Sequence, residues 1–536
     1  MKKHGTLVSI LITIIYSLVT YYWLYPPLNI YNISFWMFII SILFIFVILN
    51  TILTFRVSLN ELFNGRSSRI KFKNYKLFLC IPIIICLILV INLLLSPLFQ
   101  SKAYYNRIKV DDSGEFSDEV KQVDFNKLPL LDRDSSLKIG DRVMGQMSEL
   151  VSQFDVSDQY TQINYNDEII RVTPLEYNGV IKWFTNRGNG IKGYITVNST
   201  NGKSSLVKLD QGMKYAPSGL FNENLYRKLQ LSYPTFNFDA VNFEIDNEGN
   251  PYWIASVVKY HGVGIRREVT GVVIFNPIDG KSKYYKVKDV PNWVDHVYEA
   301  DLVLEQVGDW GKYKNGFINS LISQKGVVKT TRGYNYLAQD NDIYLYTGIT
   351  SVISDESNIG FILTNMRTKE TKFYGVAGAE EYSAMESAKG QVQQMNYTST
   401  FPLLINLNDK PTYLVSLKDN AGLVKMYGFV DVVDYQKVVV TDSSSGIKKA
   451  AEAYLNEVSD SNETGNLEKD ITINDLTTAN IDGNTYYYFR DQDGKKYKMS
   501  IKLDKNNIPF IKNGDQIHVK YSKDSDVISV GEITIK

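Results

Sequence analysis

Histidine, cysteine and carboxylate residues set the limits of the chemistry open to this chain. The four histidines stand far apart in the sequence, and none belongs to a His-Glu-x-x-His pair: His4, His261, His296 and His518. Cys80 and Cys86 are the two cysteines, and both lie inside one long apolar run. A zinc site needs several such side chains at close spacing, and a disulfide needs paired cysteines outside the membrane. The sequence therefore predicts no metal site, no cofactor and no disulfide, and it presents no recognisable catalytic set.

One segment rich in large aromatic residues brings a histidine close to carboxylates. Its residues of interest are Trp293, Asp295, His296, Glu305, Trp310 and Tyr313. Because aromatic faces bury a large area, Trp293, His296, Trp310 and Tyr313 form a candidate binding surface for a glycan or a peptide. The alternative is that these rings fill the gap between two small domains, whose cores need large side chains.

The same segment supports a hydrolase alternative. Asp295 and Glu305 flank the aromatic residues, and His296 is a candidate base. Acid–base chemistry requires the groups to reach one substrate. This alternative therefore requires the three side chains to point into a common cleft.

Three apolar runs near the N-terminus are each long enough to cross a bilayer as a helix. They cover residues 6–25, 33–55 and 77–99, and none contains a charged residue. A cleaved signal peptide would follow its apolar core with small residues, whereas the first run ends in aromatic residues and prolines. The first alanine of the chain is Ala103. The first run is therefore expected to remain as a membrane anchor.

Basic residues flank these runs unevenly. Lys2 and Lys3 precede the first run, six Lys or Arg against one Glu fill residues 56–76, and residues 26–32 carry no charge. The positive-inside rule then places the N-terminus and residues 56–76 in the cytoplasm, and everything after Phe99 outside. Merging or losing one span would reverse the side on which the large domain lies. A transporter is not expected, since the runs contain no charged residue.

The soluble part of the chain is mildly acidic. Beyond residue 99 it holds 50 basic and 57 acidic residues, a net charge of −7. A nucleic-acid-binding protein needs a basic footprint, so nucleic acid is not an expected partner. The lack of cysteine in this part argues against an animal secreted protein. We expect a multi-pass protein of the bacterial plasma membrane, with residues 100–536 extracytoplasmic and another envelope or membrane protein as a candidate partner.

Polarity and periodicity divide the first part of the soluble chain. Residues 100–140 are polar and acidic, which predicts a stalk with little packing. Apolar residues recur at helical spacing over residues 142–155, which predicts an amphipathic helix. Short strand-like runs then make residues 141–220 a mostly β region: 167–174, 179–184, 193–198 and 205–209.

Two pairs of segments repeat each other in the middle of the chain. Residues 271–287 align without gaps on residues 360–376, with Gly, Asn, Lys, Tyr and Val coinciding. Residues 243–254 similarly match residues 403–414. Each segment predicts a strand, a tight turn and a second strand. Helix-like segments precede the pairs, at residues 222–231 and 383–395, so we expect a repeated unit of one helix and an antiparallel sheet.

The turn Asp279-Gly280-Lys281, followed by aromatic and β-branched residues, resembles PepSY-type modules of bacterial extracytoplasmic proteins and peptidase propeptides. The resemblance covers residues 222–287 and 381–441. It implies a first module with an aromatic connector at 221–331 and a second module at 332–441. The order of domains also resembles an uncharacterised family of bacterial membrane-anchored proteins.

The last part of the chain predicts a short helix with a linker at residues 442–469 and an all-β domain at 470–536. Five strands are expected there, at residues 471–473, 484–490, 496–503, 516–521 and 527–535. Their pattern resembles an OB-like barrel, a fold with many binding functions. The expected fold class is thus α+β: three transmembrane helices at 1–99, a stalk, helix-plus-sheet modules and a C-terminal barrel.

These features favour a non-catalytic binding or regulatory protein of the cell envelope. Hairpin edges of the repeated unit could pair with strands of a partner. The alternatives are the envelope hydrolase described above and an accessory subunit of a membrane protein complex, in which the three spans would be docking helices.

Overall fold

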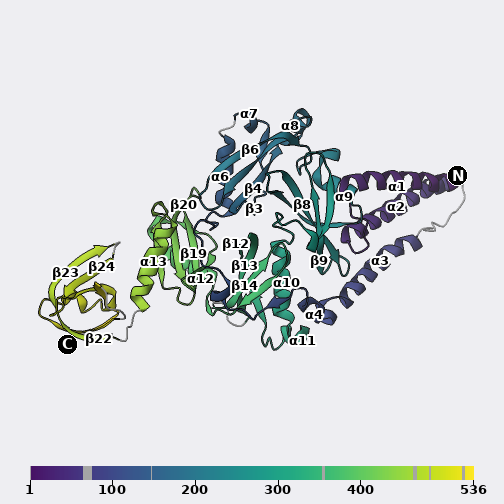
Figure 1. The fold of residues 1–536 in the computed structure, drawn as a ribbon. Helices are drawn as coiled ribbons and strands as arrows, with labels where there is room; N and C mark the ends of the chain where they lie inside the picture. The colour runs from purple at the N-terminus through teal and green to yellow at the C-terminus, as the bar shows by residue number, and fades with distance from the viewer. Residues whose placement is uncertain are drawn as a thin grey trace.

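The computed structural model describes residues 2–63, 75–145, 148–352, 357–462, 467–481, 484–521 and 526–535. The chain is a mixed α+β protein with three distinct parts (Figure 1). Long N-terminal helices extend from one side of a central body of sheets, and the C-terminal sheets extend from the opposite side (Figure 1).

Three apolar helices form the N-terminal part. They are α1 (Lys2–Leu24), α2 (Ile33–Phe63) and α3 (Tyr75–Leu94). Each contains a stretch that is long and apolar enough to cross a membrane, at His4–Leu24, Ile33–Leu53 and Leu77–Leu94. The prediction of three spans is confirmed in this sense, although part of the basic segment 56–76, residues 64–74, lies outside the described residues. Helices α1 and α2 lie side by side, and α3 diverges from them (Figure 1).

The third apolar run does not continue as one helix to residue 99. After α3 ends, a new helix, α4 (Pro97–Tyr105), begins behind Ser96. Proline has no backbone N–H to donate and is favoured in the first turn of a helix. The chain therefore leaves the third span through a break at Ser96-Pro97.

Four antiparallel sheets, each preceded by a helix, form the central body. The first layer contains α6 (Arg133–Gly145), α7 (Ser148–Val151), β2 (Phe154–Val156), β3 (Thr161–Tyr165), β4 (Glu168–Tyr177), α8 (Gly179–Asn186), β5 (Ile191–Asn198) and β6 (Ser204–Met213). The second contains η1 (Phe221–Glu223), α9 (Leu225–Ser232), β7 (Asn237–Ile245), β8 (Pro251–Tyr260), β9 (Arg267–Phe275), β10 (Ser282–Lys286) and η2 (Val287–Asp289).

The third and fourth layers repeat this order. The third contains α10 (Ala300–Tyr313), α11 (Gly316–Leu321), β11 (Val328–Thr330), β12 (Asn335–Gln339), β13 (Asp342–Ser351), β14 (Ser357–Asn365), β15 (Thr371–Tyr374) and β16 (Gly378–Ala379). The fourth contains α12 (Glu381–Gly390), η3 (Gln393–Met395), β17 (Thr398–Ser399), β18 (Leu403–Leu407), β19 (Lys410–Lys418), β20 (Val424–Asp431) and β21 (Val438–Asp442). In all four layers the long strands pair with their neighbours in sequence.

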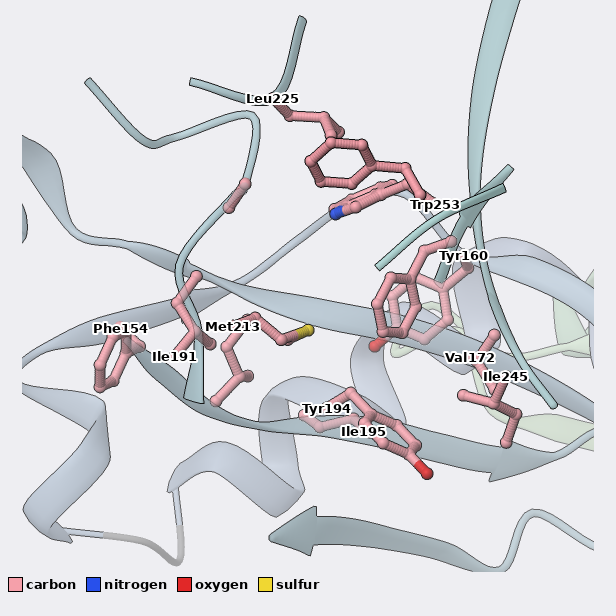
Figure 2. Packing of buried hydrophobic residues seen from close by; sticks show 14 of the residues in the cluster. Phe154, Tyr160, Val172, Ile191, Tyr194, Ile195, Met213, Leu225, Ile245 and Trp253 are labelled. Atoms are coloured by element: carbon pink, nitrogen blue, oxygen red, sulfur yellow. The ribbon is translucent and has the colours of Figure 1, made fainter. Parts of the chain in front are cut away.

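Successive layers share hydrophobic cores. Trp253 and Ala255 of β8 face the core between the first and second sheets, while Ile254 faces the core between the second and third (Figure 2 shows the first of these). Helices α9, α10 and α12 contribute buried residues to the three successive cores. Because strand side chains alternate between faces, a sheet covered on both faces needs apolar residues at every position. The middle strands are accordingly almost continuous apolar runs.

The last layer is covered by α13 (Ile447–Asn462), which follows η4 (Ser443–Ser445). Ala450, Ala451, Tyr454 and Val458 pack against Phe429 and the other apolar residues on the outer face of the fourth sheet. The amphipathic helix expected in residues 442–469 is thus present and closes the stack.

The C-terminal part consists of two small sheets around one core. Their strands are β22 (Leu467–Thr472), β23 (Asn474–Ile481), β24 (Asn484–Arg490), β25 (Lys496–Ser500), β26 (Gln516–Tyr521), β27 (Val527–Ser529) and β28 (Glu532–Ile535), with η5 (Ile501–Leu503) and η6 (Ile508–Phe510) between β25 and β26. Strands are found at all five expected places, but the one expected at 496–503 ends at Ser500 before η5, and β23 was not predicted. The expected last strand is broken at Val530-Gly531, and its two halves join different sheets.

The prediction of a loosely packed stalk at residues 100–140 is wrong. Tyr104, Ile108, Phe116 and Val120 are buried. Strand β1 (Val110–Asp111) pairs in parallel with β15, and α5 (Phe116–Glu119) packs on the third and fourth layers. Widely spaced apolar residues anchor this otherwise polar segment along the body. Their spacing has neither helix nor strand periodicity, so the packing could not be predicted from the sequence.

Two local predictions in residues 141–220 are also wrong. The single helix expected at 142–155 is not found: residues 142–145 are the end of α6, Ser148–Val151 form α7, and Phe154 already belongs to a strand. Met147 lies outside the described residues. Residues 179–184 form α8 instead of a strand. Gly179 has a φ of 84° and starts this helix, and Trp183 is buried from it. An Asn-Gly pair is typical of a hairpin turn, but Asn178-Gly179 leads into a helix here.

The two longest matching segments form hairpins with the same turn. Asn276 Oδ1 accepts hydrogen bonds from the backbone N–H groups of the second and third residues after it, and Asn365 Oδ1 does the same. Gly280 and Lys369, four residues after each asparagine, have φ of 75° and 65°. The predicted strand–turn–strand form of residues 271–287 and 360–376 is thus confirmed.

The hairpins belong to separate layers, however. Residues 332–441, expected to be one module, contribute to two different sheets. The helix of the third layer, α10, lies in the segment interpreted as an aromatic connector. The module predicted from the sequence match combined a hairpin of the third layer with the helix and a hairpin of the fourth layer. The boundary between these two layers was therefore missed.

Candidate functional site

A cavity of about 770 Å³ lies where the loop between α1 and α2 meets the central body. The membrane side of its lining comes from Leu24, Tyr25, Pro26, Pro27, Asn32, Ile33 and Ser34. The body contributes residues before and at the start of β3, residues of α9 and β7, and Tyr260 and Gly264. The cavity therefore forms only when the membrane hairpin and the first two layers come together.

Backbone and asparagine hydrogen bonds hold the α1–α2 loop against the second layer. Leu28 N donates to Pro234 O at 2.7 Å, and Gly264 N donates to Tyr31 O at 2.8 Å. The Asn32 side chain donates to Asn237 Oδ1 at 3.0 Å. These hydrogen bonds hold polar groups of the loop without using charged side chains, which agrees with its uncharged sequence.

Arg227 of α9 fixes the end of α1. Its guanidinium lies over the rings of Tyr22 and Trp23 at 4.7 and 5.1 Å from their centroids. Its Nε donates to Tyr22 O at 2.9 Å and its Nη1 to Phe221 O at 2.6 Å. Cation–π contacts strengthen when they are desolvated, and Arg227 is only 6% exposed. The aromatic residues at the end of the first apolar helix thus bind the body directly.

Asn92 of α3 provides a further link to the body. It donates to Val263 O at 2.9 Å and accepts from Val263 N at 2.8 Å. A polar side chain within an apolar span ordinarily bonds to a neighbouring helix. Asn92 instead binds the loop between β8 and β9, which also lines the cavity through Gly264.

The lining of the cavity is part apolar and part polar. Leu24, Ile33, Phe238 and Val241 supply apolar surface, while the polar side chains come mostly from the body: Arg133, Gln159, Tyr160, Thr161, Gln230, Asp239 and Asn242. Within the part of the chain that the structure describes, Gln159 Oε1, Tyr160 Oη and Asp239 Oδ2 are buried without a hydrogen-bond partner. Buried polar atoms ordinarily bond to protein, water or ligand. These three atoms are enclosed, so the polar surface that faces the cavity comes from the other polar atoms of its lining.

An irregularity in β7 shapes this lining. The pairing of β7 with β8 shifts between Phe238 and Val241, so Asp239 and Ala240 are left out of the ladder and lie at the cavity. β-Bulges commonly redirect side chains next to functional sites. Asp239 also pairs with Arg267 at 2.5 Å, and burial raises the pKa of its carboxyl group.

The four residues of the predicted binding surface are placed differently from that expectation. His296 and Tyr313 are buried, at 4% and 7% exposure. Trp293 packs on Tyr252, and Trp310 packs on Phe373. Both tryptophans belong to the core shared by the second and third sheets. This arrangement agrees with the alternative interpretation, in which the aromatic residues fill the gap between two layers.

The three residues of the hydrolase alternative do not share a cleft. Asp295 is 1% exposed and accepts a hydrogen bond from Asn164 N at 2.7 Å. His296 Nε2 lies 2.7 Å from Gln162 O. Glu305 instead lies on α10, where it binds Arg107 and Arg267. The arrangement that would favour carboxylate chemistry at these residues is therefore not found.

Asp295 and His296 belong to an internal network built on Glu244. The Glu244 carboxylate is fully buried and accepts from the backbone N–H groups of Asp295 and His296 at 2.9 and 3.0 Å. Burial raises the pKa of Glu244, and burial together with the nearby Glu244 charge raises the pKa of Asp295. Beside them, burial raises the pKa of Glu299 to about 7, although the hydrogen bond from Asn242 acts to lower it. The network holds the chain between β10 and α10 in place.

Among the described residues, no group of three or more His, Cys, Asp or Glu side chains is arranged to hold a metal ion. A comparison with protein-family models gives no match, and a comparison with curated proteins gives none either. The cavity could not be predicted from the sequence because its lining comes from segments more than 200 residues apart. The uncharged loop with two prolines after the first span was the one local feature that pointed to this place.

Proposed function

We propose that the protein is a membrane-anchored, extracytoplasmic binding protein of the bacterial cell envelope, and that its ligand occupies the cavity beneath the α1–α2 loop. The observation that carries this proposal is the cavity of about 770 Å³ with a lining that is part apolar and part polar. Ligand sites are typically concave, largely apolar and fitted with a few polar groups that fix orientation.

The position of the cavity favours an amphiphilic ligand. Leu24 ends the first span and Ile33 begins the second, so the cavity lies at the level where a bilayer meets water. Apolar groups of a ligand would contact Leu24 and Ile33, and its polar groups would contact Gln159 and Asn242. Burial of apolar area supplies the affinity, and the polar contacts supply orientation.

The modules support a binding role in a second way. We infer that the four layers are copies of one helix-plus-sheet unit, because each has a helix followed by antiparallel strands that pair in sequence order. This order agrees with the PepSY-like resemblance. Stacked units of this kind present extended surfaces, and the OB-like C-terminal sheets would add a further binding surface at the far end.

Protease accessibility tests the proposed orientation. Protease added to intact cells without a wall is expected to cut within residues 100–536, while a tag at the N-terminus stays protected, because the basic residues place that end in the cytoplasm. Lysed cells, in which both regions are digested, provide the control. Protection of residues 100–536 until lysis would contradict the extracytoplasmic placement.

Filling the cavity tests the site itself. Ala240→Trp introduces an indole at the bulge of β7 and is expected to reduce the co-purified amphiphile about tenfold or more, a loss of about 1.4 kcal/mol of binding free energy or more. Native mass spectrometry of the detergent-purified protein measures the bound mass. Ala421→Trp, at the exposed turn between β19 and β20, is the matched control.

Three outcomes are informative. A bound amphiphile in the parent protein and in Ala421→Trp, but not in Ala240→Trp, supports the proposal. Equal occupancy in all three proteins would place the ligand elsewhere. No bound amphiphile in the parent protein, even after incubation with lipid extract of the source membrane, would contradict the cavity as an amphiphile site.

A further inference from the structure

Arg171 is a buried cation without a counter-charge. It lies in the middle of β4, directly opposite Gln162 of β3 and Val197 of β5. It is only 7% exposed, and among the described residues no hydrogen bond or ion pair reaches its guanidinium; its Nε is fully enclosed without a partner. Buried Arg107 and Arg227, by contrast, each bind several partners.

Gln162 lies beside Arg171 and has the same deficiency. Directly paired residues on neighbouring antiparallel strands point to one face of the sheet with their Cβ atoms about 5 Å apart. Gln162 is 2% exposed, and both its amide Nε2 and Oε1 are buried without a partner. Two adjacent polar side chains, one of them charged, thus have unused donors in the interior.

The acid with the strongest effect on Arg171 already has another partner. Asp132 is the acid that acts on it, but the Asp132 carboxylate is held by Lys418 at 2.5 Å. Arg133 adds a second positive charge nearby, and the hydroxyls of Tyr334 and Tyr336 are also close enough to influence Arg171. Burial lowers the pKa of Arg171 to about 10, so it remains charged at neutral pH.

This arrangement is costly unless something binds there. A buried charge without a partner is strongly destabilising, and buried amide groups ordinarily have hydrogen-bond partners. A guanidinium presents a planar fork of N–H donors that matches the oxygens of carboxylate or phosphate. An amide N–H₂ beside it supplies one more donor of the same kind.

We propose that Arg171 and Gln162 form an internal binding site for a small oxyanion, the carboxylate or phosphate group of a ligand. The anion lies at the junction of the first and third layers, where Tyr336 packs edge-on against His296 and His296 contacts the backbone of Gln162. Binding there would join β3 and β4 of the first layer to β12 of the third. The site is independent of the ligand proposed for the membrane-side cavity.

Thermal unfolding of the full chain in detergent tests this site. The protein is dialysed against potassium chloride and then transferred to potassium phosphate, potassium acetate or more chloride at equal ionic strength. At tenfold excess of the bound anion over its Kd, Tm is expected to rise by roughly 2–4 °C relative to chloride. Phosphate and acetate serve as separate arms, so the responding salt identifies the oxyanion chemistry.

Variants connect the response to the site. Arg171→Met is expected to abolish the rise in Tm while matching or exceeding the parent Tm in chloride, because it removes an unpaired buried charge. Gln162→Leu, the second variant, is expected to weaken the response severalfold if Arg171→Met fails to fold. Arg187→Met is the matched control, since Arg187 is half exposed and pairs with Glu223; it should keep the full response.

The Tm measurements and the bound mass together decide whether the anion site exists. A rise in Tm with phosphate or acetate in the parent and in Arg187→Met, together with its loss in Arg171→Met or Gln162→Leu, supports the site. Native mass spectrometry would show a retained anion if dialysis fails to remove it, and a retained mass absent from Arg171→Met also supports the site. No response to either salt and no retained mass in the parent protein would overturn it.

Discussion

Replacing Arg107 with alanine is expected to lower the free energy of unfolding of the central body by about 2–4 kcal/mol, because a buried guanidinium is lost together with its hydrogen bonds to partly exposed acids. Arg107 follows α4, and its side chain is 1% exposed. It donates to Glu305 at 2.6 Å, to Asp309, and to the backbone oxygen of Arg267 at 3.1 Å. The substitution leaves the partly buried Asp309 and the exposed Glu305 of the third layer without this cation.

The effect of this substitution should extend to the membrane part. Helix α4 continues from the third apolar helix and packs on α10, so Arg107 connects α3 to the third layer. Loss of this contact is expected to increase hydrogen exchange in α4 and in the N-terminal half of α10. These segments are expected to open before the rest of the body because they share the lost contacts.

A matched exposed pair provides the control for Arg107. Lys121 and Asp340 form an ion pair with side chains 69% and 51% exposed. Lys121→Ala should change the free energy of unfolding by less than about 1 kcal/mol, since exposed ion pairs contribute little. Urea unfolding followed by tryptophan fluorescence measures both variants. Equal effects of the two substitutions would contradict a structural role for the buried network.

The membrane spans and hairpins could be predicted because their signals are local. An uninterrupted apolar run of about 20 residues has one structural solution in a bilayer. The turns at Asn276 and Asn365 likewise depend on the asparagine side chain and on a residue with positive φ four positions later. Such features need no information from distant parts of the chain.

The contacts between layers could not be predicted in this way. Arg107 binds residues about 160 to 200 positions later, and its own segment has only scattered apolar residues. Residues 179–184 are predicted as a strand from their local sequence, whereas tertiary packing of the Trp183 ring favours α8. Long-range pairing overrides weak local preference in both cases.

The candidate site was missed for the same physical reason. The aromatic segment around His296 attracted attention because large rings and a histidine are conspicuous in a sequence. The structure uses these rings in the core shared by the second and third sheets. The cavity is formed by segments far apart in the sequence, and Arg171 stands out only because its side chain has no hydrogen-bond partner in the described part of the chain after the layers pack. Both features are visible only in three dimensions.

The second large effect is expected at Glu244, whose carboxylate supports the chain between β10 and α10. Its two oxygens accept from the backbone N–H groups of Asp295 and His296, and all three residues are buried. Glu244→Ala leaves both N–H groups without an acceptor. Each buried group left without a partner costs about 1–3 kcal/mol, so the free energy of unfolding should fall by about 2–5 kcal/mol.

Asp295→Asn provides the contrast, because it removes a charge but keeps an oxygen to accept from Asn164 N. Burial and the Glu244 charge raise the pKa of Asp295 in the folded state. A raised carboxyl pKa stabilises the fold at low pH and loses that contribution as pH rises above the unfolded value near 4. Asp295→Asn should therefore be as stable as the parent at pH 4 and more stable at pH 7. Urea titrations at the two pH values measure this difference, and a parent protein that gains stability over Asp295→Asn between pH 4 and 7 would show that the Asp295 charge is favourably paired in the fold.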